Sequence, residues 1–332
     1  MRRERVLLIR LSAMGDVVQS LGAAVALAAA RPDLEICFVT QKTHASLLRG
    51  LPFASVIEHD RKAGVAGFLR TSRALRSLRA DLAIDLQGNG KSALLARCSG
   101  CRERLGAAGP WRQEPWSRWF LNRTVTVQGP RHPALVAARL VKEIAADAVV
   151  GPSRLHAEEP EIDAERRALR SIGLDPEAPF RVVLLGRPTD NRSQRPAAVA
   201  REVGQSPIPS VLLAGPAESS AVPPEGVPVL RHGPGEPRRL VALGALGARA
   251  AGGVVGGDNG ALHVLAASGA RTIALFGPQD AARTAPAEAS ALQRPDAPPC
   301  VPCERRRCRR AGGPICMDFT SLEGNPWGSR GA

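Results

Sequence analysis

An acid, an amide and a histidine stand together in VVGGDNGALHVLAASG, residues 254–269. The apolar run predicts a buried strand and the small residues after the glycines predict a helix, so the polar residues fall on the turn between them. The N–H groups of residues 260–262 would point out of the helix start, which favours phosphate. The segment predicts a diphosphate site, with a capped helix and an incidental histidine as the alternative. The candidate ligands are Asp258, Asn259, Gly260, Ala261 and His263.

A second acid follows the first apolar run of the chain, in LIRLSAMGDVVQSLGA, residues 8–23. Gly15 permits a tight turn and the close approach of a ligand, and Asp16 opens the helix that follows. Asp16 is either a helix cap or a catalytic carboxylate. A helix N-terminus favours its charged form, so it would act as a base only where water is excluded.

A glycine-rich turn also occurs in DLQGNGKSALL, residues 85–95. Gly90, Lys91 and Ser92 match the end of a P-loop, but Asp85 stands where that motif requires its first glycine. The remaining pattern is a strand, a turn and a helix start, which suits a polar or phosphorylated ligand.

Four cysteines lie close together near the end of the chain, in CVPCERRRCRRAGGPICM, residues 300–317. Cys300, Cys303, Cys308 and Cys316 are near enough in sequence to bind one structural zinc, although their spacing is not that of a standard finger. Free thiols are the alternative. A further segment, WRQEPWSRWF at residues 111–120, combines tryptophan with arginine, as a membrane interface or a well-packed loop would.

Strands and helices alternate through both halves of the chain, which predicts an α/β fold with two parallel sheets. We expect one domain over residues 1–155 and a second over 156–332, facing each other across a cleft. The acidic, proline-containing stretch 147–166 looks like a linker. In such sheets ligands bind beyond the carboxyl ends of the strands, so the turns above are placed to form sites.

The net charge of +14 raises the question of nucleic acid as a partner. Lysine and arginine together number 45, but only four are lysines, and the arginines are scattered rather than gathered in one basic helix. Aromatic residues for base stacking are few. We therefore expect no nucleic-acid partner; an anionic substrate or membrane surface explains the charge. No apolar run is long enough to cross a bilayer, and no signal-peptide pattern opens the chain, so a cytoplasmic protein is expected.

Taken together, these segments resemble the heptosyltransferase family of lipopolysaccharide core synthesis, glycosyltransferase family 9. The likeness rests on residues 8–23, on DLQGNGKSALLAR, on GGDNGALHVLAASGARTIALFGPQD and on the cysteine tail, in that order along the chain. It implies a GT-B fold of two Rossmann-like domains, the first for the acceptor and the second for the donor. It also implies an inverting transfer of heptose from ADP-heptose that requires no metal or other cofactor. The implied acceptor is a lipid-linked saccharide of the core and lipid A type, met at the inner face of the cytoplasmic membrane.

The resemblance also assigns roles to residues. Asp16 matches the general base of the family, and the residues from Asp258 to His263 match its donor-diphosphate motif. The acceptor-side candidates are Ser12, Gly15, Gln87 and Lys91. On the donor side, Glu218 falls where the family tends to hold the ribose of the nucleotide.

The sequence departs from the family at two places. Asn259 replaces a serine or threonine, with Ala261 and Leu262 in place of proline and methionine, and TDNRSQRPAAV lacks the lysine that steadies the donor phosphates. Arg192 or Arg195 would replace this lysine. The planar guanidinium of arginine binds phosphate through two hydrogen bonds, whereas the ammonium group of lysine acts as a point charge. These departures motivate one alternative, a relative that binds a nucleotide-sugar or lipid-sugar without turnover. A basic nucleic-acid-binding protein is the other.

Overall fold

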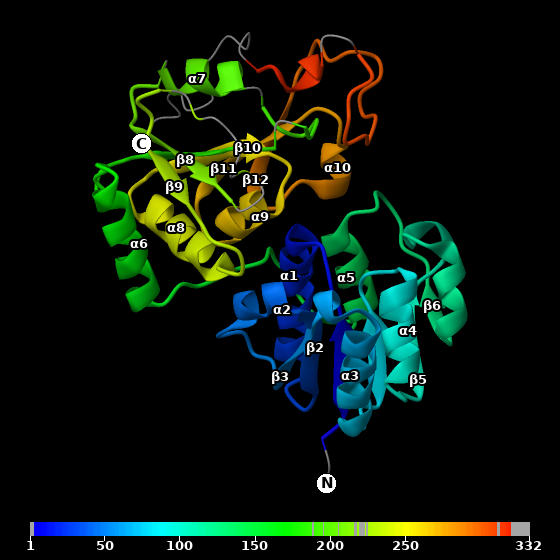
Figure 1. The fold of residues 1–332 in the computed structure, drawn as a ribbon. Helices are drawn as coiled ribbons and strands as arrows, with labels where there is room; N and C mark the ends of the chain where they lie inside the picture. Colours follow the sequence, from blue (N-terminus) through cyan, green and yellow to red (C-terminus); the bar gives the residue numbers. More distant parts are fainter. Residues whose placement is uncertain are drawn as a thin grey trace. The chain divides into compact units, whose positions relative to one another are not determined.

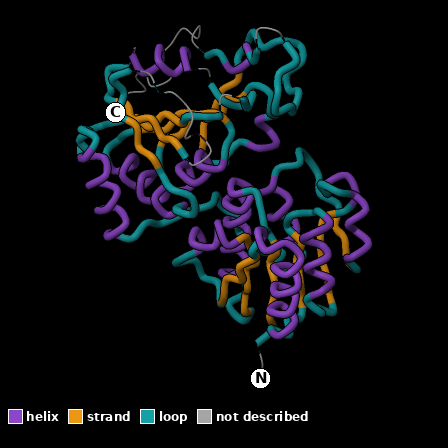
Figure 2. Tube along the Cα trace, viewed as in Figure 1, coloured by secondary structure: helices purple, strands orange, loops and turns teal. Residues whose placement is uncertain are grey.

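The computed structural model describes residues 3–187, 189–194, 196–204, 206–215, 218, 223, 225–310 and 313–319. The chain divides into two compact units, residues 1–154 and 155–332. In both units helices cover a parallel sheet (Figures 1 and 2).

The first unit holds a six-stranded sheet in the order β3-β2-β1-β4-β5-β6, with every neighbouring pair parallel. Residues of β1, β2 and β4 are buried along nearly their whole length, as expected of strands covered on both faces. The strands are β1 (Arg5–Ile9), β2 (Glu35–Gln41), β3 (Ser55–His59), β4 (Leu82–Asp85), β5 (Glu103–Ala107) and β6 (Arg123–Val125).

Helices α1 to α4 connect successive strands of this unit, and α5 follows its last strand, β6. Helix α1 packs against α5, and α3 packs against α4. The α-helices are α1 (Met14–Ala30), α2 (Lys42–Ala45), α3 (Gly64–Ser77), α4 (Gly90–Cys98) and α5 (Pro133–Lys142); the 3₁₀ turns are η1 (Ser46–Leu48), η2 (Arg61–Ala63), η3 (Gly109–Trp111) and η4 (Pro115–Phe120).

The second unit repeats the same winding, with a parallel sheet in the order β12-β11-β10-β7-β8-β9. In both sheets the first strand of the unit lies beside the fourth, which is the strand order of Rossmann folds. The strands are β7 (Arg181–Leu184), β8 (Ser210–Ala214), β9 (Val229–Arg231), β10 (Gly253–Gly257), β11 (Arg271–Phe276) and β12 (Ala289–Gln293).

A buried polar network joins two helices of the second unit. Glu165 of α6 accepts a hydrogen bond from Nε2 of His232 at 2.7 Å and a second from Nε of Arg239 on α8 at 2.9 Å. Burial by itself would raise the pKa of the Glu165 carboxyl, but these two partners outweigh it and lower the pKa. The helices are α6 (Glu159–Ser171), α7 (Pro196–Gly204), α8 (Pro237–Arg249), α9 (Gly260–Ala267) and α10 (Ala281–Thr284), with the 3₁₀ turn η6 (Ile315–Met317).

The linker expected at residues 147–166 contains the boundary between the two units, after residue 154, but it is shorter than predicted. Ser153 is buried, and its hydroxyl donates to the carbonyl of Val18 at 2.6 Å in the first unit. The N–H of Leu155 donates to the carbonyl of Ala267 at 2.9 Å in the second unit. Helix α6 begins at Glu159, and its amphipathic pattern buries Ile162, which the high content of acids had obscured.

Candidate functional site

Most of the functional residues expected from the sequence follow two neighbouring strands in each sheet. In the first unit the turns after β1 and β4 carry Ser12, Gly15 and Asp16, and Gln87 and Lys91 respectively. In the second unit the turns after β7 and β10 carry the Arg192 loop and the segment from Asp258 to His263. Each pair of strands flanks the position where the strand order reverses, which is where α/β sheets bind ligands.

Asp16 lies in the first turn of α1, and one oxygen of its carboxylate, Oδ2, is held by neighbouring groups. Its Oδ2 pairs with Nη2 of Arg10 at 2.6 Å and accepts a hydrogen bond from the N–H of Ala13 at 3.2 Å. The side chain is 28% exposed, and Oδ1 has no hydrogen bond to the described part of the chain. One carboxylate oxygen is therefore fixed, while the other can accept a proton from a ligand.

Gln87 and Arg10 tie together the two turns of the first unit. The side-chain oxygen of Gln87 accepts hydrogen bonds from the N–H groups of Leu11 at 2.7 Å and Ser12 at 3.3 Å. Nη1 of Arg10 donates to the carbonyl of Leu86 at 2.5 Å. Gln87 thus positions the Asp16 turn instead of presenting its oxygen to a ligand, whereas Lys91 is exposed at the second position of α4.

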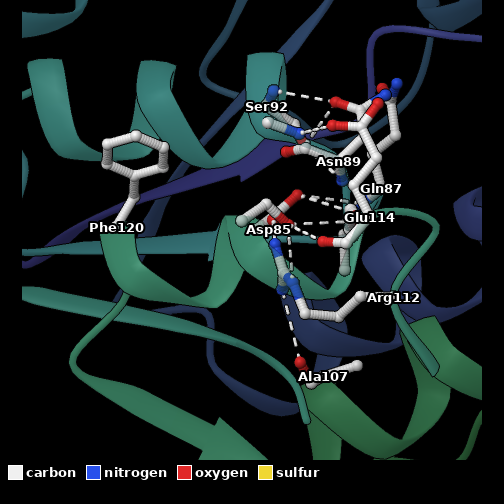
Figure 3. Close-up of polar contacts among 12 residues, drawn as sticks. Asp85, Gln87, Asn89, Ser92, Ala107, Arg112, Glu114 and Phe120 are labelled. Atoms are coloured by element: carbon white, nitrogen blue, oxygen red, sulfur yellow. Dashed lines mark hydrogen bonds and ion pairs between the residues drawn. The ribbon is translucent and has the colours of Figure 1, made fainter. Parts of the chain in front are cut away.

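A buried ion pair anchors the segment 108–121 beneath the β4–α4 turn (Figure 3). Nη2 of Arg112 donates to Oδ2 of Asp85 at 2.7 Å, and both side chains are fully buried. Nε of Arg112 donates to the Ser117 hydroxyl at 2.8 Å. Glu114 then accepts a hydrogen bond from the N–H of Gly90 at 2.8 Å, so this segment caps the start of α4.

The β10–α9 turn has the form expected of an anion site, with one difference. The side chain of Asn259 caps α9 by accepting a hydrogen bond from the N–H of Leu262 at 3.1 Å, so this amide is not open as we expected. The N–H groups of Gly260 and Ala261 have no acceptor among the residues that the structure describes. His263 is buried, and its Nε2 lies 3.3 Å from Oδ1 of Asp258. Two amides at the helix start remain available to an anion.

The Arg192 loop lies directly against this turn. A Cβ on Gly257 would approach the carbonyl oxygen of Arg192 to 1.8 Å, so only glycine fits at the end of β10. The guanidinium of Arg192 makes a two-pronged contact with Asp190, from Nε at 3.0 Å and Nη2 at 2.7 Å. The hydrogen bond to Asp190 raises the pKa of Arg192, against the effect of burial, and the nearby charge of Asp258 adds to this. A fixed cation therefore lies beside the β10–α9 turn.

Two further residues, Glu218 and Arg195, were expected on the donor side, and only Glu218 lies within the described residues. Glu218 follows β8, and Oε1 of its largely buried side chain lies 3.8 Å from Nε of Arg187. Burial raises the pKa of the Glu218 carboxyl, opposed by the charge of Arg187. Arg195 lies outside the described residues.

The structure does not show the zinc site expected at the terminal cysteines. Within the described ranges, no three His, Cys, Asp or Glu side chains are grouped closely enough to hold a metal ion. Cys316 is buried with Met317 against Gly277 at the end of β11, while Cys300 is exposed. Burial raises the pKa of the Cys316 thiol, and the neighbouring Cys303 and Cys308 add to this effect. Cys316 acts here as a packed apolar side chain.

Sequence reasoning missed three residues of the site: Arg10, Asp190 and Arg112. Arg10 and Arg112 are buried charged residues, and a single arginine among many in the sequence gives no sign of burial. Asp190 stands two residues before Arg192, and this spacing was the available signal that the arginine has a carboxylate partner.

Two Rossmann-type sheets in tandem, each with site candidates at the point where its strand order reverses, form the GT-B fold. The family model for glycosyltransferase family 9 (heptosyltransferase) matches residues 68–170 and 239–312, just over half of the chain. The chain therefore belongs to glycosyltransferase family 9 and is an enzyme of the heptosyltransferase family. The resemblance drawn from the sequence is confirmed.

Individual relatives agree with the family. The chain is 29% identical over 329 residues to lipopolysaccharide heptosyltransferase 1 of Pseudomonas aeruginosa, covering 92% of this chain and 87% of the relative. Among solved structures, a family 9 glycosyltransferase of Veillonella parvula has a TM-score of 0.75 at 18% identity, with 88% and 87% of the two chains covered. The ADP-heptose lps heptosyltransferase II of E. coli has a TM-score of 0.69 at 21% identity, with 88% and 91% covered.

Proposed function

We propose that the protein transfers a heptose from ADP-heptose to a lipid-linked saccharide of the lipopolysaccharide core, with inversion at the anomeric carbon and without a metal ion. The observation that carries the proposal is the pair of sites at the two reversal points, one with a carboxylate and one with anion-binding groups. A solved relative, the E. coli heptosyltransferase WaaC, is described with ADP. It has a TM-score of 0.65 at 22% identity, with 86% of this chain and 92% of that chain covered.

The donor belongs on the second unit in this proposal. The open N–H groups of Gly260 and Ala261 and the guanidinium of Arg192 lie where a leaving diphosphate gains negative charge. Fixed donors at such a position stabilise the transition state, which is usually the largest single contribution to catalysis. They supply positive charge that a metal supplies in other transferases, and this is why we propose metal independence. Glu218 binds the ribose of the nucleotide, and Asp258 orients His263 beside the phosphates.

The acceptor belongs on the first unit. Oδ1 of Asp16 takes the proton from the acceptor hydroxyl, and that oxygen attacks the anomeric carbon opposite the leaving ADP. Arg10 holds Oδ2, which leaves Oδ1 as the oxygen that meets the ligand. Ser12, Gly15 and Lys91 line the same turns, and Lys91 offers a cation to an anionic acceptor.

The proposed acceptor implies where in the cell the enzyme acts. No helix in the described part of the chain has the length and apolar character of a membrane span. We place the enzyme in the cytoplasm, in peripheral contact with the anionic inner face of the cytoplasmic membrane, where a lipid-linked acceptor is reached.

ADP release from ADP-heptose and a core acceptor tests the proposal. Asp16→Asn removes the base while keeping the shape, so we expect kcat to fall by about 100-fold or more. Asp33→Asn, which changes an exposed aspartate paired with Arg31, is the matched control and keeps full activity. EDTA leaves the wild-type rate unchanged. Equal rates for Asp16→Asn and wild type would refute the proposed role of Asp16.

One observation favours a second function, the binding of a nucleotide-sugar without turnover. Both charged groups at the sites already have internal partners, Asp16 with Arg10 and Arg192 with Asp190. A binding protein would show ADP affinity by calorimetry and no ADP release with any core acceptor. Turnover by the wild type that is lost in Asp16→Asn removes this alternative.

A further inference from the structure

Two tryptophan side chains stand out from the surface of the first unit. Trp119 is 79% exposed and Trp116 is 56% exposed, and both belong to the 3₁₀ turn η4. Indoles carry large apolar area, so their exposure on one short turn requires a reason. We define the Trp surface as Trp116, Arg118 and Trp119.

Buried contacts hold in place the segment that carries the Trp surface. Arg112 forms its buried ion pair with Asp85 and holds Ser117, which lies between the two tryptophans in sequence. Trp116 lies over Gly90, where an added Cβ would meet its ring at 2.3 Å, and it contacts Phe120 edge to face at 6.1 Å. The tryptophans are therefore presented outward by a rigid support.

The charges around this turn are those that attract an anionic surface. The Arg118 guanidinium lies 6.0 Å from the centre of the Trp119 ring and is exposed. Of the two acids in residues 97–131, Glu103 pairs with Arg123 and Glu114 caps Gly90. Exposed arginines of this segment form no ion pair within the described residues; they are Arg97, Arg102, Arg118 and Arg131.

We propose that the Trp surface is the part of the enzyme that docks on an anionic phospholipid bilayer. The proposal rests on the proposed function, because a lipid-linked acceptor brings the enzyme to a membrane. Indole rings settle at the level of the headgroups, and arginine pairs with lipid phosphate. A stable protein partner would need about 800 Å² on this side, whereas two indoles expose at most about 400 Å². A bilayer needs no matching pocket.

Vesicle sedimentation tests the docking surface on the full-length protein. The probes are vesicles of phosphatidylcholine alone and vesicles with about one third phosphatidylglycerol, which supplies the anionic charge. Trp119→Ala should weaken binding to the anionic vesicles by about tenfold, because it removes exposed apolar area. Trp119→Phe should recover part of the loss. Arg118→Glu should weaken binding to anionic vesicles and leave binding to phosphatidylcholine unchanged.

The matched control lies on another helix of the same unit. Val65 and Leu69 of α3 are 76% and 48% exposed and are not part of the Trp surface, so Val65→Ala with Leu69→Ala removes exposed apolar area from another element. This double variant should bind anionic vesicles as wild type does. Unchanged vesicle binding by Trp119→Ala, or an equal loss in the control, would overturn the proposal. Trp119 packs on little else, so its variant should keep the wild-type melting temperature.

Activity assays separate this proposal from the proposed function. With a deacylated, water-soluble core acceptor, Trp119→Ala should turn over at the wild-type rate. With the acceptor embedded in anionic vesicles, its KM should rise by about tenfold, in line with the weaker binding. If the wild type releases no ADP with either acceptor, the proposed function fails while vesicle binding still tests the Trp surface.

Discussion

Replacement of Arg112 by methionine provides a quantitative test of the buried ion pair. The substitution leaves the Asp85 carboxylate in the interior without its cation, although Oδ1 of Asp85 keeps hydrogen bonds from the N–H groups of Gln87 at 3.1 Å and Gly88 at 3.0 Å. Removal of one partner of a buried pair costs about 3–5 kcal/mol. Because half of the carboxylate stays satisfied, we expect the first unit to lose about 3 kcal/mol of unfolding free energy.

Urea unfolding followed by tryptophan fluorescence measures this loss. Three of the four tryptophans of the chain, Trp111, Trp116 and Trp119, lie in the segment that Arg112 anchors, so the fluorescence reports on that segment. Arg118→Met is the matched control, because Arg118 is an exposed arginine on the same turn, and its cost should stay within about 0.5 kcal/mol.

A double-mutant cycle completes the test. Asp85→Asn combined with Arg112→Met removes both charges, so no ion is left alone in the interior, and we expect a coupling energy of about 2 kcal/mol. A loss below about 1 kcal/mol for Arg112→Met, with coupling near zero, would show that the pair does not anchor the segment.

Two further predictions concern the second unit. The pKa of Glu165 lies below its ordinary value because its basic neighbours, His232 among them, outweigh burial, so its contribution to stability is complete above about pH 4.3 and is lost as the pH falls further. Acid titrations of unfolding free energy should therefore show a steeper decline for wild type than for Glu165→Gln, and parallel curves would contradict this. Gly257→Ala forces the Arg192 loop away from β10, so calorimetry should show weaker ADP binding and melts a loss of about 1–3 kcal/mol. Gly204→Ala, where a Cβ meets open space, should change neither, and equal ADP affinity in both variants would refute the proposed contact.

Most strands were predictable from the sequence, whereas three of the edge strands were not. Strands β1, β2, β4, β7, β10 and β11 are centred on apolar residues because both of their faces are buried. The edge strands β6, β9 and β12 are short or partly exposed, so their sequences lack that signal. The helix starts at Asp16 and Asn259 were predictable because turn chemistry is local.

The hydrogen-bond and ion-pair partners of the site residues could not be predicted from the sequence. The contacts of Arg10 with Leu86 and of Gln87 with the Asp16 turn depend on β1 and β4 being neighbours, which the sequence does not state. The packing of Cys316 against Gly277 at the end of β11 was equally invisible in the sequence, and the expected zinc site is not shown among the described residues.

The contact of Ser153 with α1 has a consequence for synthesis of the protein. The strands and helices of the first unit precede residue 155 in the chain, and so does Ser153, which contacts α1. A growing polypeptide can therefore complete this half on the ribosome before the other half is translated, since domains fold as units from the N-terminal end. The second half must wait for Cys316 and Met317, which belong to its core. Assembly of the second unit is thus a late event in the life of each new molecule.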